Sequence, residues 1–122
     1  MAEFEKIAKD FVDFYYAQFD SNRTLLSALY REHSMLTFES TAHLGTTAIV
    51  QKLMDLPFES VKHEVETRDA QPSINGGILV LVTGRLLVDG QERPMNFTQA
   101  FQLMPEGGSY FVYNDIFKLV FG

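Results

Sequence analysis

The 122-residue sequence contains no cysteine and no tryptophan. The absence of cysteine excludes a disulfide scaffold, a thiolate metal site and a cysteine nucleophile. Basic residues are also in the minority, because 10 Lys and Arg stand against 16 Asp and Glu, giving a net charge of −6. An acidic chain without a basic run is a poor binder of nucleic acid, and it is better suited to a basic protein partner.

Long apolar runs are missing as well. No stretch approaches the roughly 18–20 apolar residues of a membrane-spanning helix, and the first residues lack the basic and apolar parts of a secretory signal. We therefore expect neither membrane insertion nor secretion. The three histidines, His33, His43 and His63, do not have the spacing of a metal-binding motif. The sequence also has no glycine-rich loop that could bind a phosphate group. We therefore expect neither a metal nor a cofactor.

Aromatic residues, by contrast, are abundant. Eleven Phe and five Tyr occur in a chain that is 46% hydrophobic, which predicts a folded domain with an aromatic core. A chain of this length rarely divides into two domains. We therefore expect a single domain over residues 1–122.

The first half of the chain has mainly helical periodicity. Apolar residues recur at helical spacing over 4–19, which predicts one long helix. A short second helix is expected over 23–30 and a strand over 34–40. A third helix is expected over 46–55, capped by a threonine at its start and ended by Pro57.

The second half has the period of strands. Strands are expected over 61–69, 78–88, 95–104 and 110–121, and the nearly continuous apolar run 78–88 predicts a strand covered on both faces. Helices followed by hairpin-connected strands indicate an α+β fold. We expect a curved antiparallel sheet that wraps around the long N-terminal helix and forms a cone open at one end.

Alternation on the last strand divides its side chains between two faces. One face is predicted to hold Phe111, Tyr113, Asp115, Phe117 and Leu119. The other face holds Ile116, and Leu81 and Ala100 could extend it across neighbouring strands. Such a broad mixed patch suggests a partner, most simply a second copy of the chain. An ordinary half-exposed sheet face is the alternative interpretation.

Several short segments together carry a resemblance over nearly the whole chain. They are Phe14-Tyr15-Tyr16, Phe19-Asp20, Arg23, Leu36-Thr37-Phe38-Glu39, Ile49-Val50, Lys52-Leu53, Leu56-Pro57-Phe58, Asp69, Gln71-Pro72, Gly84, Leu86 and Asn114-Asp115-Ile116-Phe117. In this order and spacing the sequence resembles the nuclear transport factor 2 family. The resemblance implies the cone fold, a homodimer, and a carrier of the small GTPase Ran that moves between cytoplasm and nucleus and is concentrated at the nuclear pore.

The resemblance also implies a Ran site at the mouth of the cone. In the family, Ran in its GDP state inserts an aromatic side chain there, and its basic residues pair with acids on the rim. The rim acids would be Glu39, Asp89 and Glu92. The pocket lining would be Phe38, Leu56, Phe58, Val61, His63, Leu86, Val88, Met95, Phe117 and Leu119. This chain departs from the family at Ser60, where members often carry a base, and at Arg93, which adds a positive charge.

A second family site binds the Phe-Gly repeats of nuclear-pore proteins, near the groove between subunits. The resemblance assigns Phe4 and Asp20 to that site. Phe4 has an alternative interpretation as a helix residue that only packs on the core. The dimer interface would be formed by Leu81, Ala100 and Ile116.

A rival function is catalysis, because isomerases and dehydratases share the cone fold. His63 and Asp115 could form an acid–base pair in the cavity and remove a proton next to a carbonyl. The alternative is that His63 is a wall residue and Asp115 a hydrogen-bonded structural acid. Since no further motif supports catalysis, we expect a carrier and not an enzyme. A dimeric binding module without a transport role is the third possibility.

Overall fold

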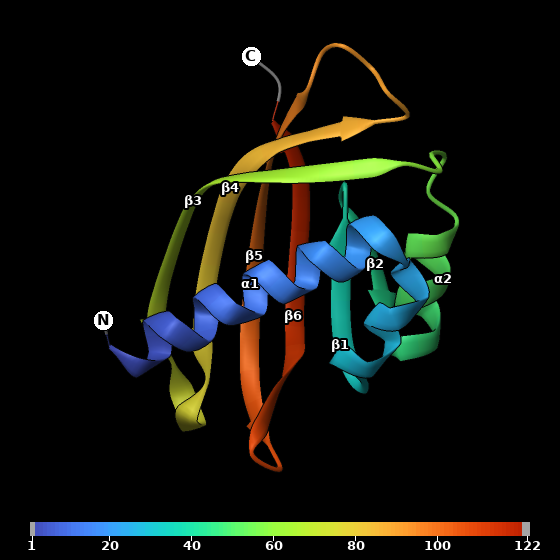
Figure 1. Cartoon of the computed structure of the whole chain (residues 1–122). Coiled ribbons are helices and arrows are strands. Elements are labelled where there is room, and N and C mark those ends of the chain that lie inside the picture. Colours follow the sequence, from blue (N-terminus) through green and yellow to red (C-terminus); the bar gives the residue numbers. More distant parts are fainter. Residues whose placement is uncertain (1, 121–122) are drawn as a thin grey trace.

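The computed structural model describes residues 2–120 and contains the predicted helices and strands in the predicted order, together with a short strand and a 3₁₀ turn that were not predicted (Figure 1). The elements are α1 (Glu3–Ser21), the 3₁₀ helix η1 (Arg23–Leu29), β1 (Tyr30–Phe38), β2 (Thr41–Leu44), α2 (Thr46–Met54), β3 (Val61–Pro72), the 3₁₀ turn η2 (Ile74–Gly76), β4 (Ile78–Val88), β5 (Met95–Glu106) and β6 (Ser109–Val120). Phe121, the predicted end of the last strand, lies outside the described residues.

The long helix α1 forms because its two faces differ in polarity. Its outer face carries the ion pairs Lys6–Asp10 and Lys9–Asp13, each at 2.9 Å and with the i,i+4 spacing that stabilises a helix. Its inner face buries Ala8, Val12, Tyr15, Tyr16 and Phe19. The helix crosses the concave face of the sheet, so the predicted cone around a helix is confirmed (Figure 1).

The sheet is mixed, with strand order β2-β1-β6-β5-β4-β3. Every neighbouring pair is antiparallel except β1 and β6, which run parallel. The expectation of a purely antiparallel sheet was therefore wrong at this one junction. The first strand of the chain therefore pairs with the last, one position in from the edge strand β2.

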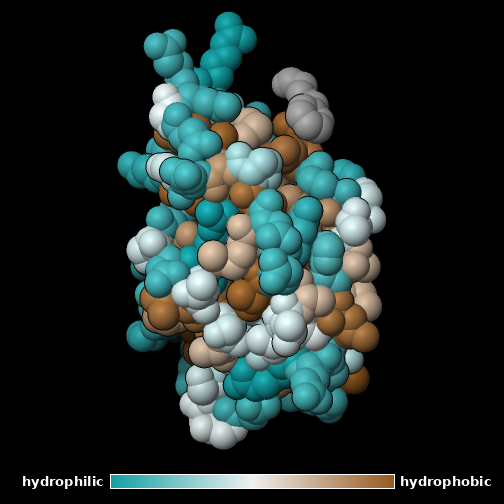
Figure 2. All heavy atoms as spheres, turned by 90° about the vertical axis from the view of Figure 1, so that its right-hand side faces the viewer, coloured by the Kyte–Doolittle hydropathy of each residue, from teal (hydrophilic) through white to brown (hydrophobic). Residues whose placement is uncertain are grey.

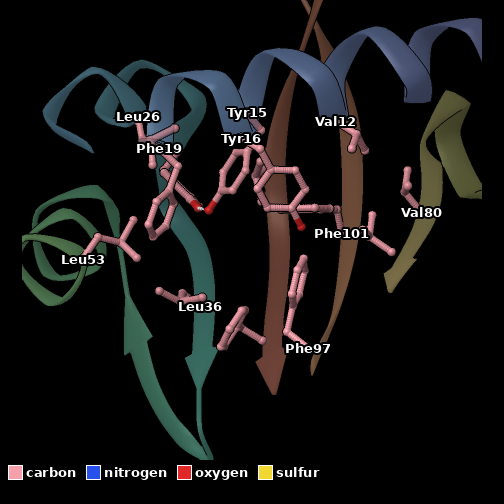
Figure 3. Packing of buried hydrophobic residues seen from close by; sticks show 14 of the residues in the cluster. Val12, Tyr15, Tyr16, Phe19, Leu26, Leu36, Leu53, Val80, Phe97 and Phe101 are labelled. Atoms are coloured by element: carbon pink, nitrogen blue, oxygen red, sulfur yellow. Dashed lines mark hydrogen bonds between the residues drawn. The ribbon is translucent and has the colours of Figure 1, made fainter. Parts of the chain in front are cut away.

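The core lies between α1 and the sheet and is largely aromatic. Tyr15 and Tyr16 extend from α1 toward the strands, where Phe97 and Phe101 meet them (Figure 3). The ring of Phe101 lies 4.9 Å from that of Tyr15 in an edge-on arrangement, a geometry that aromatic pairs prefer. Aromatic packing therefore fixes how α1 sits on the sheet.

A bulge in β6 overturns part of the predicted facing. Gln102 pairs with Asn114, but Leu103 pairs with Val112, so Tyr113 is left without a register partner. The extra residue reverses the alternation. Asp115 faces the core as predicted, whereas Phe111 packs against His33 on the outer face.

Four smaller expectations differ from the structure in detail. The chain covers only one face of β4, because Leu79 and Leu81 are 44% and 47% exposed. The predicted strand 34–40 begins earlier, at Tyr30, and pairs with a four-residue strand, β2, that the pattern did not indicate. The residue at the N-cap of α2 is Gly45, so no threonine side chain caps that helix. The predicted helix over 23–30 is 3₁₀.

Candidate functional site

One end of the sheet encloses an apolar cavity of about 360 Å³. The ends of β1, β4 and β6 and the starts of β3 and β5 meet there, and α2 adds one wall. Figure 2 shows the side of the molecule that carries α2, where apolar atoms are visible between hydrophilic ones. A cavity of this size and character is typical of a binding site for a small apolar group.

All ten residues that the resemblance assigned to the pocket line this single cavity. They are Phe38, Leu56, Phe58, Val61, His63, Leu86, Val88, Met95, Phe117 and Leu119. The sequence did not indicate the remaining wall residues, which are Tyr15, Phe19, Leu36, Leu53, Pro57, Gln91 and Gln99. Several of these belong to helices, whose periodicity marked them only as core.

Stacked aromatic rings form one side of the cavity. Phe38 lies 4.7 Å from Phe117 with the two rings nearly parallel, and Phe117 stacks in turn on Phe97 at 5.6 Å. The ammonium of Lys52 lies 5.3 Å from the centre of the Phe38 ring, within the range of a cation–π contact. This side of the cavity is therefore an aromatic wall.

The three predicted rim acids have different positions. Asp89 lines the cavity, at the end of β4. Glu39 follows β1 and is half-buried; its Oε1 accepts a hydrogen bond from the backbone N–H of Leu119, and its own N–H donates to the Phe117 carbonyl at 3.1 Å. Glu92 is exposed in the loop after β4 and is not part of the cavity wall, where Gln91 lies instead.

Asp89 is held by the chain that precedes β3. Its Oδ1 accepts hydrogen bonds from the backbone N–H groups of Glu59 and Ser60, both at 3.0 Å. Its own N–H donates to the Ser60 carbonyl at 2.8 Å. Ser60 therefore engages Asp89 through its main chain.

His63 and Asp20, assigned above to two different sites, are in direct contact. Nδ1 of His63 lies 2.6 Å from Oδ1 of Asp20, and the side chain of His63 is only 3% exposed. The imidazole also stacks on Tyr16 at 4.5 Å. Asp20 thus lies behind the cavity wall, where it orients His63.

Asp115 belongs to a buried polar network that is separate from His63. Its carboxylate accepts hydrogen bonds from Gln99 at 2.7 Å, Tyr30 at 2.8 Å and Tyr15 at 3.3 Å. Burial raises the pKa of Asp115 to about 6, and the hydrogen bonds counteract part of that rise. The proposed acid–base pair is not assembled, because His63 and Asp115 have different partners and Asp115 is not part of the cavity wall.

The residues assigned to the dimer interface form a row across the outer face of the sheet. Leu81 pairs with Ala100, and Ala100 pairs with Ile116. Leu81 and Ile116 are 47% and 53% exposed. Phe4 lies in the first turn of α1 and is half-buried against the core. Among residues 2–120, no cluster of three or more potential metal ligands occurs, and no helix is long and apolar enough to cross a membrane.

Comparison with known proteins agrees with this architecture. A family model described as the nuclear transport factor 2 (NTF2) domain matches residues 7–119. The chain belongs to the nuclear transport factor 2 family. Nuclear transport factor 2 of Emericella nidulans is 61% identical over 99% of this chain and 98% of that protein, and its counterpart in Kluyveromyces lactis is 57% identical over 96% and 94%.

Solved structures extend the comparison to three dimensions. Nuclear transport factor 2 from Cryptosporidium parvum has a TM-score of 0.93 and 43% identity, over 97% of this chain and 95% of that one. A putative scytalone dehydratase from Novosphingobium aromaticivorans, with a TM-score of 0.81 over 96% and 84% of the chains but 13% identity, shares the fold alone. These highly similar proteins are thus named as transport factors, whereas the dehydratase is a distant structural neighbour.

Proposed function

We propose that this chain is a nuclear import carrier that binds Ran in its GDP state and moves it through the nuclear pore. Membership of the nuclear transport factor 2 family supports a nuclear transport function. The observation that carries the proposal is the gathering of all ten implied pocket residues around one apolar cavity, with Asp89 at its edge.

The chemistry of the cavity fits an aromatic guest on a basic partner. Burying an aromatic side chain of about 200 Å² at about 25 cal/mol/Å² contributes on the order of 5 kcal/mol before the costs of association. Glu39 and Asp89, together with the net charge of −6, favour a partner that presents basic residues around the aromatic side chain. Such charges mainly orient the partner and increase the rate of association.

The proposal includes two further contacts and a location. Two copies would pair through the outer row of Leu81, Ala100 and Ile116, and Phe4 would contribute to a site for Phe-Gly repeats beside that interface. Disordered repeats with single Phe anchors bind weakly and reversibly, which suits passage through a pore. The protein would therefore be found in cytoplasm and nucleus and be concentrated at the pore.

A pull-down that compares Ran loaded with GDP and with GTP tests the proposal. We expect retention of the GDP form and rejection of the GTP form, because the switch segments of a GTPase rearrange with the γ-phosphate. Equal retention or equal rejection of the two forms would contradict the proposal. Equal rejection together with an intact dimer would favour a binding module without a transport role.

A further inference from the structure

The wall of the cavity includes a stretch between α2 and β3 that has no regular secondary structure. This mouth segment, residues 56–60, connects α2 to β3 and contributes Leu56, Pro57 and Phe58 to the cavity. A segment outside helices and strands lacks the regular backbone hydrogen bonds that hold the other walls. Its position therefore depends on other contacts, which include the buried side chain of Leu56 and two charged side chains from elsewhere in the chain.

Arg23, from the start of η1, supplies the first of these contacts. Its guanidinium donates through Nη1 to the Leu53 carbonyl at 3.0 Å and through Nη2 to the Phe58 carbonyl at 2.9 Å. It also lies 5.2 Å from the centre of the Phe58 ring. The planar fork of arginine thereby ties the mouth segment to the last turn of α2, a geometry that a lysine ammonium does not reproduce.

Asp89 supplies the second contact from the opposite side. One carboxylate oxygen accepts the N–H groups of both Glu59 and Ser60, as described above, and the Asp89 N–H binds the Ser60 carbonyl. Asp89 adopts a left-handed backbone conformation with φ of +48°. Bonds from backbone amides to an ionised acceptor are stronger than bonds between neutral groups.

We propose that Arg23 and Asp89 form a clamp that holds the mouth segment in place as a wall of the cavity. The guanidinium of Arg23 binds the carbonyl of Phe58, and the carboxylate of Asp89 binds the N–H groups of Glu59 and Ser60. The segment is therefore held on both sides of the bend that leads into β3. Both are positioning residues, and Asp89 therefore acts through Phe58 as well as through its charge. The consequence for Ran affinity rests on the proposed function, whereas the clamp itself does not.

Variants of Asp89 separate the two roles of this residue. Asp89→Asn removes the charge but keeps an oxygen that can accept from the two amides. Asp89→Ala and Asp89→Gly remove both the charge and the accepting oxygen. Because glycine tolerates a positive φ, an effect that both variants show cannot come from backbone strain. Arg23→Lys keeps the positive charge but loses the planar guanidinium that donates to two carbonyls at once. Asp55→Ala is a matched control. Asp55 is an exposed acid next to the mouth segment, and its carboxylate accepts a hydrogen bond from the side chain of Gln51 in α2.

The experiment measures amide hydrogen exchange at Glu59 and Ser60 by NMR, and calorimetric affinity for Ran-GDP. We expect exchange to accelerate roughly tenfold or more in Asp89→Ala and Asp89→Gly, and to stay close to wild type in Asp89→Asn and Asp55→Ala. Affinity should fall further in Asp89→Ala and Asp89→Gly than in Asp89→Asn. Arg23→Lys should weaken binding although its charge is retained.

Two results would overturn the clamp. Unchanged exchange in Asp89→Ala and Asp89→Gly would mean that the carboxylate does not hold the segment. Equal loss of affinity in Asp89→Asn and Asp89→Ala would mean that Asp89 acts only as a charge. If the wild-type chain fails to bind Ran-GDP, the proposed function fails, and the exchange measurement still decides whether the clamp exists.

Discussion

Asp20, at the end of α1, contacts His63 of the cavity wall through both of its carboxylate oxygens. One carboxylate oxygen lies 2.6 Å from Nδ1 of the imidazole, and the other accepts the backbone N–H of His63 at 2.9 Å. In the neutral ring, a proton on Nδ1 donated to Asp20 leaves Nε2 as an acceptor. The carboxylate thus fixes both the orientation of the ring and the start of β3.

The first prediction concerns Glu39. Glu39→Lys should weaken Ran-GDP binding at least roughly tenfold, because an acid facing basic residues becomes a like charge. Glu39→Gln is the matched control, since it keeps an acceptor for the Leu119 N–H and only removes the charge. It should lose less affinity for Ran-GDP than Glu39→Lys. Calorimetry provides the affinities and circular dichroism checks the fold. Wild-type affinity in Glu39→Lys would remove Glu39 from the site.

A second prediction separates the two alternatives for Phe4. Phe4→Ala should reduce retention on immobilised Phe-Gly repeats and leave Ran-GDP binding near normal, because Phe4 is not part of the cavity wall. The ring is half-buried, so the cost in unfolding free energy should be below the roughly 3–5 kcal/mol of a fully buried Phe→Ala change. Equal loss of both binding activities would show that Phe4 is only a core residue.

The third prediction concerns assembly. Ile116→Glu should shift the dimer toward monomer by at least roughly tenfold in the dissociation constant, because two carboxylates would lose water and meet across the two-fold axis. Leu25→Glu is a matched control, since Leu25 has nearly the same exposure (52%) but lies in η1, away from the outer row. Sedimentation equilibrium measures both. An undiminished dimer in Ile116→Glu would place the interface elsewhere.

The fourth prediction follows from the buried Asp115. Its pKa of about 6 exceeds the roughly 3.9 of an unfolded aspartate, so the folded state holds a proton that the unfolded state has already released. The stability from this group is complete below about pH 4 and is lost as the pH rises through about 6. The loss is on the order of 3 kcal/mol.

Denaturant titrations at several pH values test this. Between pH 4 and 7 the free energy of unfolding of the wild-type protein should fall relative to that of Asp115→Asn, which has no such titration. The Asn variant should also start less stable, because its amide group would face the Gln99 donor. Parallel pH profiles would show that Asp115 titrates normally.

The fifth prediction concerns Gly84. A side chain there would collide with the Glu64 carbonyl, at the point where β3 shifts register against β4. Gly84→Ala should therefore cost more than about 2 kcal/mol of unfolding free energy. Gly90→Ala serves as the comparison, because its φ of +71° strains alanine while the surrounding space is open, and it should cost only about 1 kcal/mol. Equal costs would mean that β3 can move away from Gly84.

Much of this architecture was accessible from the sequence because its signals are local. The helical spacing in α1 and the apolar run in β4 depend only on neighbouring residues, and both elements were placed to within two residues. The facing of Phe111 was not accessible, since a one-residue bulge at Tyr113 leaves no mark on composition. The short strand β2 was missed because it has only four residues and depends on β1 for pairing.

The candidate site divides in the same way. The pocket residues could be carried over by resemblance, and each lines the cavity. The contacts between Asp20 and His63 and between Asp89 and the mouth segment join residues 43 and about 30 positions apart, and no periodicity indicates them. The resemblance assigned Asp20 to the Phe-Gly site, and the contact of its carboxylate with His63 in the cavity wall was missed.

The parallel junction of β1 and β6 has a consequence for the order in which the chain assembles. The hairpin β1–β2 joins the rest of the sheet only through β6, because β6 lies between β1 and β5. During synthesis, residues 30–44 must wait for about 70 further residues before their partner strand exists. Pairings over such separations close slowly, so β1, which carries Leu36 and Phe38 of the cavity, has no place in the sheet until the final strand arrives.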